Sequence, residues 1–310
     1  MLLEISNLTK RYGKVTALDR AEFTLNGGGI IGFVGANGAG KTTALRIMSG
    51  LEEPDSGDVK LDGVSLIDYP DKMRRRVGFM PDTLPDAADI IVKEYLDFFI
   101  NSFVPAESRR EVFERITGFT GTETFLKRRL SDLSKGMKQR VSLARLMIHN
   151  PDLLLLDEPA AGLDPRARAE LHEMLKFLAG QGKMIFLSSH ILAELESMIS
   201  GVVIIDKGKI IRYGSLDESA SEQPLEVEKV VLGILGEVSD VVIKLIAGLP
   251  MVRDVKRNLR TLECQVVSGE FAGFLMALGQ FNFPLAWLRR SDRTVELEKL
   301  FLEVTAKGDN

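Results

Sequence analysis

The sequence of 310 residues contains a single cysteine, Cys264, so no disulfide can form within the chain. Disulfides persist in oxidising compartments, and a chain without them is better suited to a reducing one such as the cytoplasm. Long apolar runs are missing too, since no stretch reaches the ~18 residues that a membrane span needs. The N-terminal MLLEISNLTKRYG turns polar too early for a signal peptide. If the protein serves a membrane, we expect it to do so through a partner.

The sequence also has little excess charge of either sign. A formal net charge of -4 and a pI near 5.6 give no broad positive field for a phosphate backbone, so nucleic acid is not an expected partner. The basic runs at 74–76 and 127–129 are interpreted as solvated faces. What the chain does have is 45% hydrophobic residues and enough length for two domains.

The order of expected elements divides the chain into two domains. Residues 1–217 begin with alternating strands typical of an antiparallel edge sheet and continue with buried strands and helices of an α/β fold. Within them, apolar residues at helical spacing predict a helical subdomain at about 85–150. A polar stretch at 218–225 is interpreted as a linker. Residues 226–310 predict a small ferredoxin-like α+β domain that ends in a helix at 294–306.

A phosphate-binding loop is predicted where GANGAGKT follows the buried strand IIGFVG and precedes a helix. Glycines let backbone amides turn toward phosphates, Lys41 can reach the β and γ oxygens, and the Thr42 hydroxyl can take a magnesium position. The alternative is a tight glycine turn with an incidental lysine. The candidate nucleotide-binding residues of this segment are Gly35, Ala36, Asn37, Gly38, Ala39, Gly40, Lys41, Thr42 and Thr43.

Two acids follow the buried run LLLL, at the carboxyl end of an expected parallel strand. Asp157 is the candidate magnesium ligand, and Glu158 is the candidate that orients or deprotonates the attacking water. A salt bridge at the end of the strand is the alternative for either acid. Together with the loop, these residues predict a nucleoside-triphosphate hydrolase with a nucleotide and Mg²⁺ as cofactors.

Further motifs stand in a fixed order along the first domain: Tyr12, GANGAGKTT, GFMPD, LSKGMKQR, LLLLDEP, AGLDP and SSH. With this set, order and spacing, residues 1 to about 217 resemble the ATP-binding subunit of ATP-binding-cassette (ABC) transporters. The resemblance implies a P-loop NTPase cassette with a mixed central sheet, an antiparallel edge sheet and a helical insert. It also implies ATP and Mg²⁺ as cofactors, ATP hydrolysis, and a separate integral membrane permease as partner.

The resemblance implies roles for single residues as well. Tyr12 would stack on adenine, Ser134 and Gly136 would bind a γ-phosphate, Asp164 would lie in the loop that links two sites, and His190 would contact the γ-phosphate. Each has a simpler alternative. Tyr12 could be a half-buried strand aromatic, His190 could neighbour a helix cap, and Asp164 could cap the helix that begins at Pro165.

The motif LSKGM raises the question of what a second anion site would bind. It could be an ordinary polar helix start, but free amides at a helix start attract an anion, and the chain already has one phosphate loop. A head-to-tail pair of chains gives both features a use, with Ser134 and Gly136 of one copy closing over the ATP of the other. The resemblance implies this arrangement.

The motifs depart from the family pattern at three positions. Lys135 and Met137 replace a glycine and the glutamine of Leu-Ser-Gly-Gly-Gln, although Ser134 and Gly136 are retained. Asp82 stands where the family has a glutamine after GFMP, as a candidate contact to magnesium or water. Hydrolysis is still expected.

The C-terminal domain, which ends in LEKLFLEVTA, resembles the tail of ATPase subunits from bacterial exporters. We therefore interpret the chain as the energy-coupling subunit of an exporter, at the cytoplasmic face of the plasma membrane, with aromatics near 95–103 pushing on the membrane protein. Internal packing of those aromatics is the alternative. The rival class is a soluble ABC ATPase that acts on ribosomes or nucleic acid, and a third reading is a regulatory protein without turnover, which Glu158 opposes.

Overall fold

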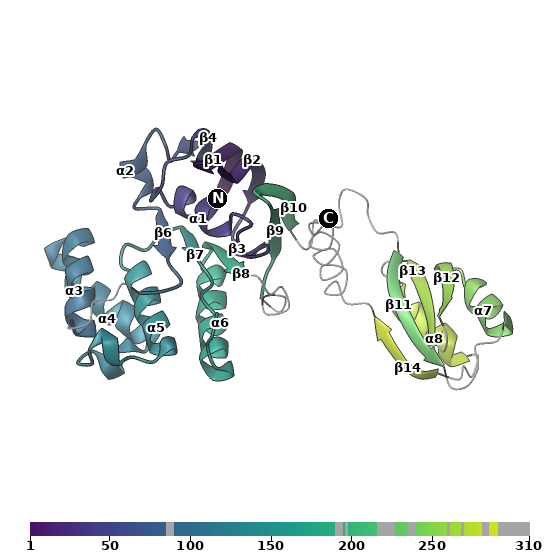
Figure 1. Ribbon diagram of the computed structural model, residues 1–310. Coiled ribbons are helices and arrows are strands. Elements are labelled where there is room, and N and C mark those ends of the chain that lie inside the picture. Colours follow the sequence, from purple (N-terminus) through teal and green to yellow (C-terminus); the bar gives the residue numbers. More distant parts are fainter. Residues whose placement is uncertain are drawn as a thin grey trace. The chain divides into compact units, whose positions relative to one another are not determined.

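The computed structural model describes residues 1–84, 90–189, 195, 198–215, 227–234, 240–258, 261–267, 270–280 and 285–290. The chain divides into two compact units, Met1–Asp217 and Glu218–Ala306 (Figure 1). Within the described ranges, no helix has the length and apolar character needed to cross a membrane.

The first unit contains a four-stranded antiparallel sheet in the order β2-β1-β4-β5. Its strands are β1 Leu2–Tyr12, β2 Val15–Asn26, β4 Ser56–Leu61 and β5 Val64–Ser65. Buried and exposed residues alternate along the second half of β2, because successive side chains of a strand point to opposite faces. The antiparallel edge sheet predicted from the sequence is confirmed.

The central sheet has six strands in the order β10-β9-β3-β8-β7-β6. They are β3 Gly29–Val34, β6 Val77–Met80, β7 Leu153–Leu156, β8 Met184–Ser189, β9 Gly201–Asp206 and β10 Lys209–Ser215. Neighbours from β9 to β6 pair in parallel, and β10 pairs antiparallel with β9. All residues of β7 and β8 are buried, which explains the apolar runs LLLL and MIFL; two buried serines end β8. The mixed central sheet is confirmed.

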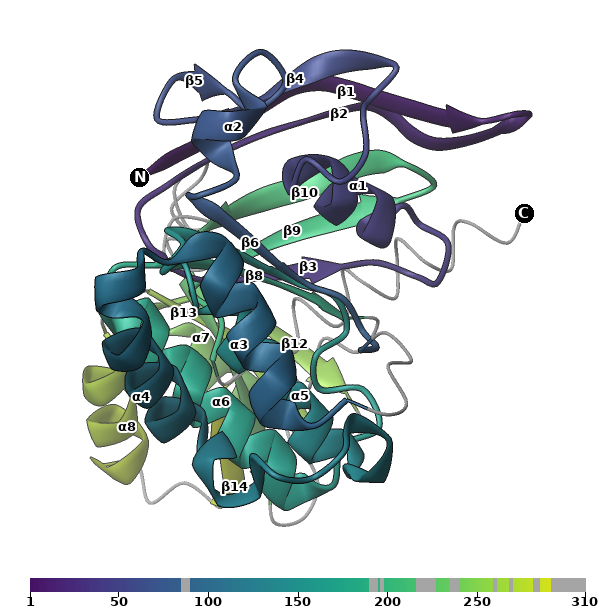
Figure 2. The same ribbon diagram turned by 90° about the vertical axis from the view of Figure 1, so that its left-hand side faces the viewer.

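The helices of the first unit include the predicted helical insert. They are α1 Lys41–Met48, α2 Pro70–Met73, α3 Val92–Phe103, α4 Arg109–Thr120, α5 Lys135–Leu146 and α6 Pro165–Gly180, with single 3-10 turns at Ala106–Ser108, Thr122–Phe125 and Leu130–Asp132. Figure 2 shows α3, α4 and α5 grouped on the side of the central sheet away from β1 and β2. The insert therefore extends one end of the sheet, and α5 carries LSKGM at its start.

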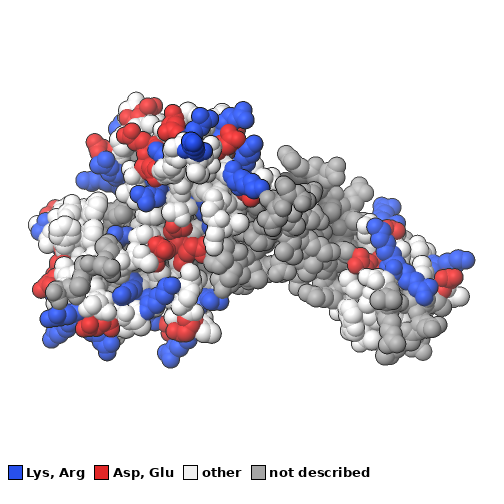
Figure 3. All heavy atoms as spheres, viewed as in Figure 1, with Lys and Arg blue, Asp and Glu red and all other residues white. Residues whose placement is uncertain are grey.

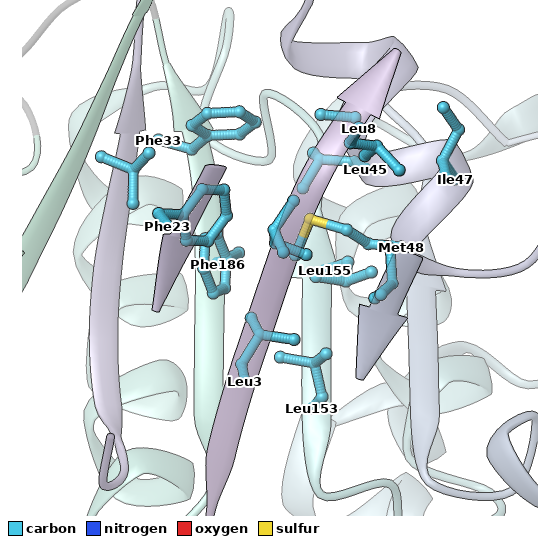
Figure 4. Packing of buried hydrophobic residues seen from close by; sticks show 14 of the residues in the cluster. Leu3, Leu8, Phe23, Phe33, Leu45, Ile47, Met48, Leu153, Leu155 and Phe186 are labelled. Atoms are coloured by element: carbon cyan, nitrogen blue, oxygen red, sulfur yellow. The ribbon is translucent and has the colours of Figure 1, made fainter. Parts of the chain in front are cut away.

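The main core of the first unit fills the space between the antiparallel sheet, α1 and the central sheet (Figure 4). The Phe186 ring centroid lies 6.1 Å from that of Phe23 and 6.2 Å from that of Phe33. Leu45 and Met48 of α1 are fully buried in the same core. This packing fixes α1 to the sheet, and with it the glycine-rich loop that precedes the helix.

Charged side chains of both signs are interspersed over the face of the first unit shown in Figure 3. Several form pairs one helical turn apart, such as Lys93 with Asp97 at 2.6 Å and Arg110 with Glu114 at 2.8 Å. Exposed pairs of this kind contribute only about 0.3–0.5 kcal/mol each. These pairs lie on a solvated surface.

The second unit has the order strand, helix, strand, strand, helix, strand that the sequence predicted. Its elements are β11 Val227–Ile234, α7 Asp240–Ala247, β12 Val252–Asn258, β13 Thr261–Val267, α8 Phe271–Gln280 and β14 Leu285–Arg290. The antiparallel sheet has the order β12-β13-β11-β14, and its own core includes Leu232, Leu262, Cys264 and Phe274. The helix expected at 294–306 lies outside the described residues.

Candidate functional site

The glycine-rich loop runs from the end of β3 to the start of α1, and two of its glycines are required by close backbone approach. A Cβ on Gly40, whose φ is +108°, would lie 2.4 Å from the Ala17 carbonyl oxygen. A Cβ on Gly35 would lie 2.4 Å from the Ile205 carbonyl oxygen. Real Cβ atoms do not approach so closely, so the loop is built tightly against β2 and β9 and its shape is fixed.

Lys41 is buried at the first position of α1, with 6% of the residue exposed. Its ammonium donates to the carbonyl oxygens of Gly35 at 2.7 Å and Ala36 at 3.1 Å, and lies 3.9 Å from Glu158 Oε1. Burial lowers the pKa of Lys41 below its usual range, and the carboxylates of Glu158 and Asp157 oppose that shift. The cation is thus held at the loop, next to the acid pair.

The Asp157 carboxylate, just after β7, accepts hydrogen bonds on both of its oxygens. Its Oδ2 accepts a hydrogen bond from Thr42 Oγ1 at 2.8 Å, and its Oδ1 accepts one from Ser188 Oγ at 2.6 Å. Its backbone N–H donates to the Met80 carbonyl oxygen at 2.9 Å. The ends of β6, β7 and β8 and the start of α1 therefore meet at one carboxylate that is only 5% exposed.

Glu158 adopts a backbone conformation that is uncommon for a residue with a side chain, with φ at +46°. Its N–H donates to Ser188 Oγ at 2.8 Å. Strained backbone of this kind persists only where its surroundings fix it, and it gathers at functional sites. Ser188 thus holds both acids. Ser188 belongs to the motif SSH but had no predicted role, although a serine pair at the end of a buried apolar strand was the available signal.

Tyr12 lies at the end of β1, beside α1, and 48% of it is exposed. Its hydroxyl donates to the Glu52 carboxylate, which also lies 3.4 Å from Lys10 Nζ and from Arg46 Nε. Burial and Glu52 raise the pKa of Tyr12, while Thr43 opposes the shift. The ring therefore lies beside the start of α1, with Lys10 Nζ 5.6 Å from its centroid, and its half-exposed position at a strand end agrees with the half-buried strand aromatic of the alternative.

The starts of α5 and α6 lie against each other. Ser134 Oγ accepts from the Met137 N–H at 3.3 Å and Asp164 Oδ1 accepts from the Ala167 N–H at 2.9 Å, so each side chain caps its own helix. A Cβ on Gly136 would lie 3.0 Å from the Ala167 Cβ. Asp164 does cap α6, as its simpler alternative stated, and α6 starts there against the turn of α5 that follows the exposed Ser134.

An ion-pair group joins α5 and α6 one turn further along. Arg140 of α5 pairs with the Glu170 carboxylate of α6, and Arg166 lies 3.1 Å from the same carboxylate. The two guanidinium groups, Arg140 first, hold the pKa of Glu170 below its usual range. The two helices therefore approach the candidate site as one packed pair.

Asp82 stands beyond β6, the last strand of the central sheet. Its carboxylate accepts from Thr83 Oγ1 at 3.2 Å, and its carbonyl oxygen accepts from Gln139 Nε2 of α5 at 3.4 Å. Arg145 donates to the Phe79 carbonyl at 3.1 Å, and His149 Nε2 lies 3.2 Å from the Val77 carbonyl. An edge strand has backbone groups without a strand partner, so these side chains satisfy β6 and dock the helical insert on it.

The structure thus brings the predicted residues together in two groups. Lys41, Thr42, Asp157 and Glu158 form one group around the loop. Ser134, Gly136 and Asp164 form a second group at the starts of α5 and α6, and the hydrogen bonds of both caps stay within their own helices. His190 lies outside the described residues.

Comparisons with known proteins agree on one family. The family model described as ABC transporter matches residues 18–161. Over 307 residues the chain is 32% identical to the Nod factor export ATP-binding protein I of Ralstonia nicotianae, covering 99% of this chain and 94% of that protein. It is 34% identical over 211 residues to the bacitracin transport ATP-binding protein BcrA of Bacillus licheniformis, covering 68% of each.

Solved structures give the same fold. An ATP-binding subunit of an ABC transporter superposes with a TM-score of 0.64 at 30% identity, covering 72% of this chain and 93% of that one. An ATP-binding cassette solved as a post-hydrolysis dimer with ADP and Pi superposes with a TM-score of 0.61 at 24% identity, covering 69% and 98%. At that identity the second likeness shows the fold alone.

Proposed function

This chain belongs to the ABC transporter family as an ATP-binding ATPase subunit, and from that membership we propose that two copies act head to tail. Each ATP is held by the glycine-rich loop of one copy and closed over by Ser134 and Gly136 of the other. The observation that carries the proposal is the second group of residues, at the start of α5. Ser134 is exposed there, next to backbone amides of the first helical turn that attract an anion.

The residues around the loop fit Mg²⁺ as well as ATP. Thr42 Oγ1 and Asp157 Oδ2 are 2.8 Å apart, and a hydroxyl with a carboxylate beside phosphate oxygens is a usual magnesium environment. Thr42 and Asp157 would hold the ion, which when bound neutralises charge on the phosphates. Lys41 reaches the β and γ phosphates by leaving the loop carbonyls, and Glu158 orients and deprotonates the attacking water.

The remaining residue roles extend the same proposal. Tyr12 stacks on the adenine, and His190 contacts the γ-phosphate. Asp82 contacts the magnesium ion or its water with its exposed carboxylate, and Asp164 lies where the two sites adjoin. These assignments follow the family motifs. The position of Tyr12 beside α1 supports one of them, and the position of Asp164 at the start of α6, where Ala167 lies against Gly136 of α5, supports another.

The closed dimer drives a separate integral membrane permease, and the transport direction is export. Support comes from the full-length similarity to a Nod factor export protein and from the similarity to a bacitracin transport protein. The chain then works at the cytoplasmic face of the membrane through that partner. A ribosome- or nucleic-acid-directed ATPase is not favoured by these relatives.

The surface offered to the permease lies on α3. Tyr95, Leu96 and Ile100 are buried, so part of this helix packs internally as the alternative reading stated. Phe98 and Phe103 are 64% and 46% exposed. We assign the permease contact to these two rings. Residues 1–217 are the ATPase domain, 218–225 the linker and 226–310 an accessory domain of ferredoxin-like type.

The test separates phosphate contact from helix stability at Ser134, in a Glu158→Gln background that traps bound ATP. Aspartate and asparagine cap a helix about as well as serine, but only aspartate repels a phosphate. We expect Ser134→Asp to abolish the ATP-dependent dimer in sedimentation velocity and Ser134→Asn to retain it in part, with both variants binding ATP normally as single chains. An ATP-dependent dimer of undiminished strength with Ser134→Asp would remove the composite site.

A further inference from the structure

Lys135 occupies a position where the family signature usually has glycine, and its side chain has a specific neighbour. A Cβ on Gly162 would lie 2.9 Å from Lys135 Nζ and 3.7 Å from its Cδ and Cε. The lysine side chain therefore lies along the backbone of Gly162, in the loop between β7 and α6. Gly162 also has φ at +64°, in the left-handed region, and leaves room for the ammonium.

Helix stability does not account for a lysine at this position. Lys135 is the first residue of α5, where a cation interacts unfavourably with the helix dipole. The first turns of α5 and of α6 contain no acidic residue, and Asp164, the acid that precedes α6, accepts the Ala167 N–H as the cap of its own helix. The structural feature that accounts for a lysine at this position is the approach of its ammonium to Gly162.

The loop that Lys135 contacts is short and leads directly to Glu158. The Ala161 N–H donates to the Glu158 carbonyl oxygen at 3.1 Å, and the Leu163 N–H donates to the Ala160 carbonyl oxygen at 3.2 Å. A shift at Gly162 is therefore transmitted through hydrogen-bonded turns to a glutamate whose backbone is already strained. On its other side Lys135 adjoins Ser134.

We propose that Lys135 is a positioning residue that couples the two nucleotide sites of the dimer. Its ammonium holds the loop at Gly162 against the start of α5, so that closure of Ser134 over the partner's ATP also sets Glu158 of its own site. The inference rests on the proposed head-to-tail dimer and adds to it a link within each chain. In this role Lys135 acts through Glu158 and not by contact with the nucleotide or the reacting atoms.

The first experiment measures steady-state ATP hydrolysis by the full chain. Lys135→Met keeps most of the side chain and removes the charge, and we expect kcat to fall roughly 2- to 30-fold, the usual range for a coupling residue. The Hill coefficient for ATP should fall toward one, the single-chain affinity for ATP should stay unchanged, and Lys135→Arg should restore most of the rate. Lys138→Met, one turn along α5, is the matched control and should leave all of these values unchanged.

The second experiment is a double-mutant cycle, because Gly162→Ala both strains the backbone and displaces the ammonium. The strain is common to any background, whereas displacement matters only where Lys135 is present. We expect Gly162→Ala to reduce kcat more in the wild type than in Lys135→Ala. Equal fold-changes in both backgrounds, or a Lys135→Met variant with wild-type kcat and Hill coefficient, would overturn the inference.

Failure of this inference differs from failure of the dimer itself. If Ser134→Asp prevents the ATP-dependent dimer while the Lys135 variants and the cycle have no effect, the composite site stands and the coupling role of Lys135 is wrong. If Ser134→Asp also leaves the dimer intact, the head-to-tail proposal is wrong and the coupling role falls with it.

Discussion

Replacing Ser188 with alanine perturbs the hydrogen bonds that hold both acids of the site. Ser188 Oγ donates to Asp157 Oδ1 at 2.6 Å and accepts the Glu158 N–H at 2.8 Å. Ser188 is 1% exposed and Asp157 is 5% exposed, so bulk water does not replace the lost partners. The variant therefore leaves a buried carboxylate with one donor fewer and a backbone N–H without its acceptor.

The magnitude follows from these two losses. A hydrogen bond to a charged group contributes about 1.5–3 kcal/mol, and an unpaired buried N–H costs about 1–3 kcal/mol. Because the two losses share one hydroxyl and the surroundings relax, we expect Ser188→Ala to lower the free energy of unfolding by roughly 2–4 kcal/mol. A displaced catalytic group loses about 100-fold in rate per 1 Å, so kcat should fall by roughly 10- to 100-fold as Glu158 relaxes from its left-handed backbone.

Ser65 provides a matched control away from the loop. It is 5% exposed, donates to Asp58 Oδ1 at 2.7 Å, and accepts the N–H groups of Ile67 at 3.2 Å and Asp68 at 3.1 Å. Ser65→Ala should lose comparable stability in urea unfolding but keep its kcat for phosphate release. If Ser188→Ala also kept the wild-type kcat, the claim that Ser188 positions Glu158 would be refuted.

Two further predictions concern backbone geometry and the single thiol. Gly40→Ala should lower the thermal midpoint and the ATP affinity of the single chain much more than Gly63→Ala does. Both substitutions cost about 1–3 kcal/mol of strain in left-handed backbone, but only at Gly40 would the new Cβ lie 2.4 Å from a backbone oxygen. Equal losses in the two variants would contradict this prediction. Burial raises the pKa of Cys264 from 9.0 to about 12, so the native thiol should resist a thiol reagent at pH 8 and react on unfolding in urea. Because the thiol ionises at lower pH in the unfolded chain, the contribution of Cys264 to the free energy of unfolding should decline as pH rises from about 9 toward 12. Rapid labelling of the native protein would show that the second unit opens.

The acid pair and the loop could be predicted because a motif and a topological rule agree on them. Carboxyl ends of parallel strands meet at one edge of a sheet, so Asp157 after β7 had to approach the loop after β3. The role of Ser188 depends on register instead. Leu156 pairs with Leu187 across β7 and β8, which brings the next residues, Asp157 and Ser188, side by side. No pattern within either strand specifies that register.

The contacts that α5 and the residues after it make with the central sheet could not be predicted from the sequence, for a related reason. Arg145 of α5 and His149, which follows it, satisfy carbonyls of β6, and Gln139 of α5 donates to the Asp82 carbonyl just beyond that strand. These contacts form because β6 is the last strand of its sheet, which depends on strand order and not on local sequence. The approach of Lys135 to Gly162 likewise depends on how α5 and α6 meet. In the second unit, by contrast, polar and apolar residues alternate along β13, in agreement with its alternating burial, and the helices have apolar residues at helical spacing. The order of elements could therefore be predicted from the sequence.

The head-to-tail site is tested most directly by mixing two variants that are defective in different halves. Lys41→Met removes the ammonium from the loop, and Ser134→Asp disables the start of α5, so neither variant alone should hydrolyse ATP. In an equal mixture, half of the dimers formed at random are mixed and each contains one complete site, so roughly a quarter of the wild-type rate is the upper bound. The chain that supplies Glu158 to that site carries Ser134→Asp and has lost the coupling through Lys135, so we predict a clear recovery that stays below this bound. A mixture as inactive as its two parents, or a parent that is active alone, would contradict the account.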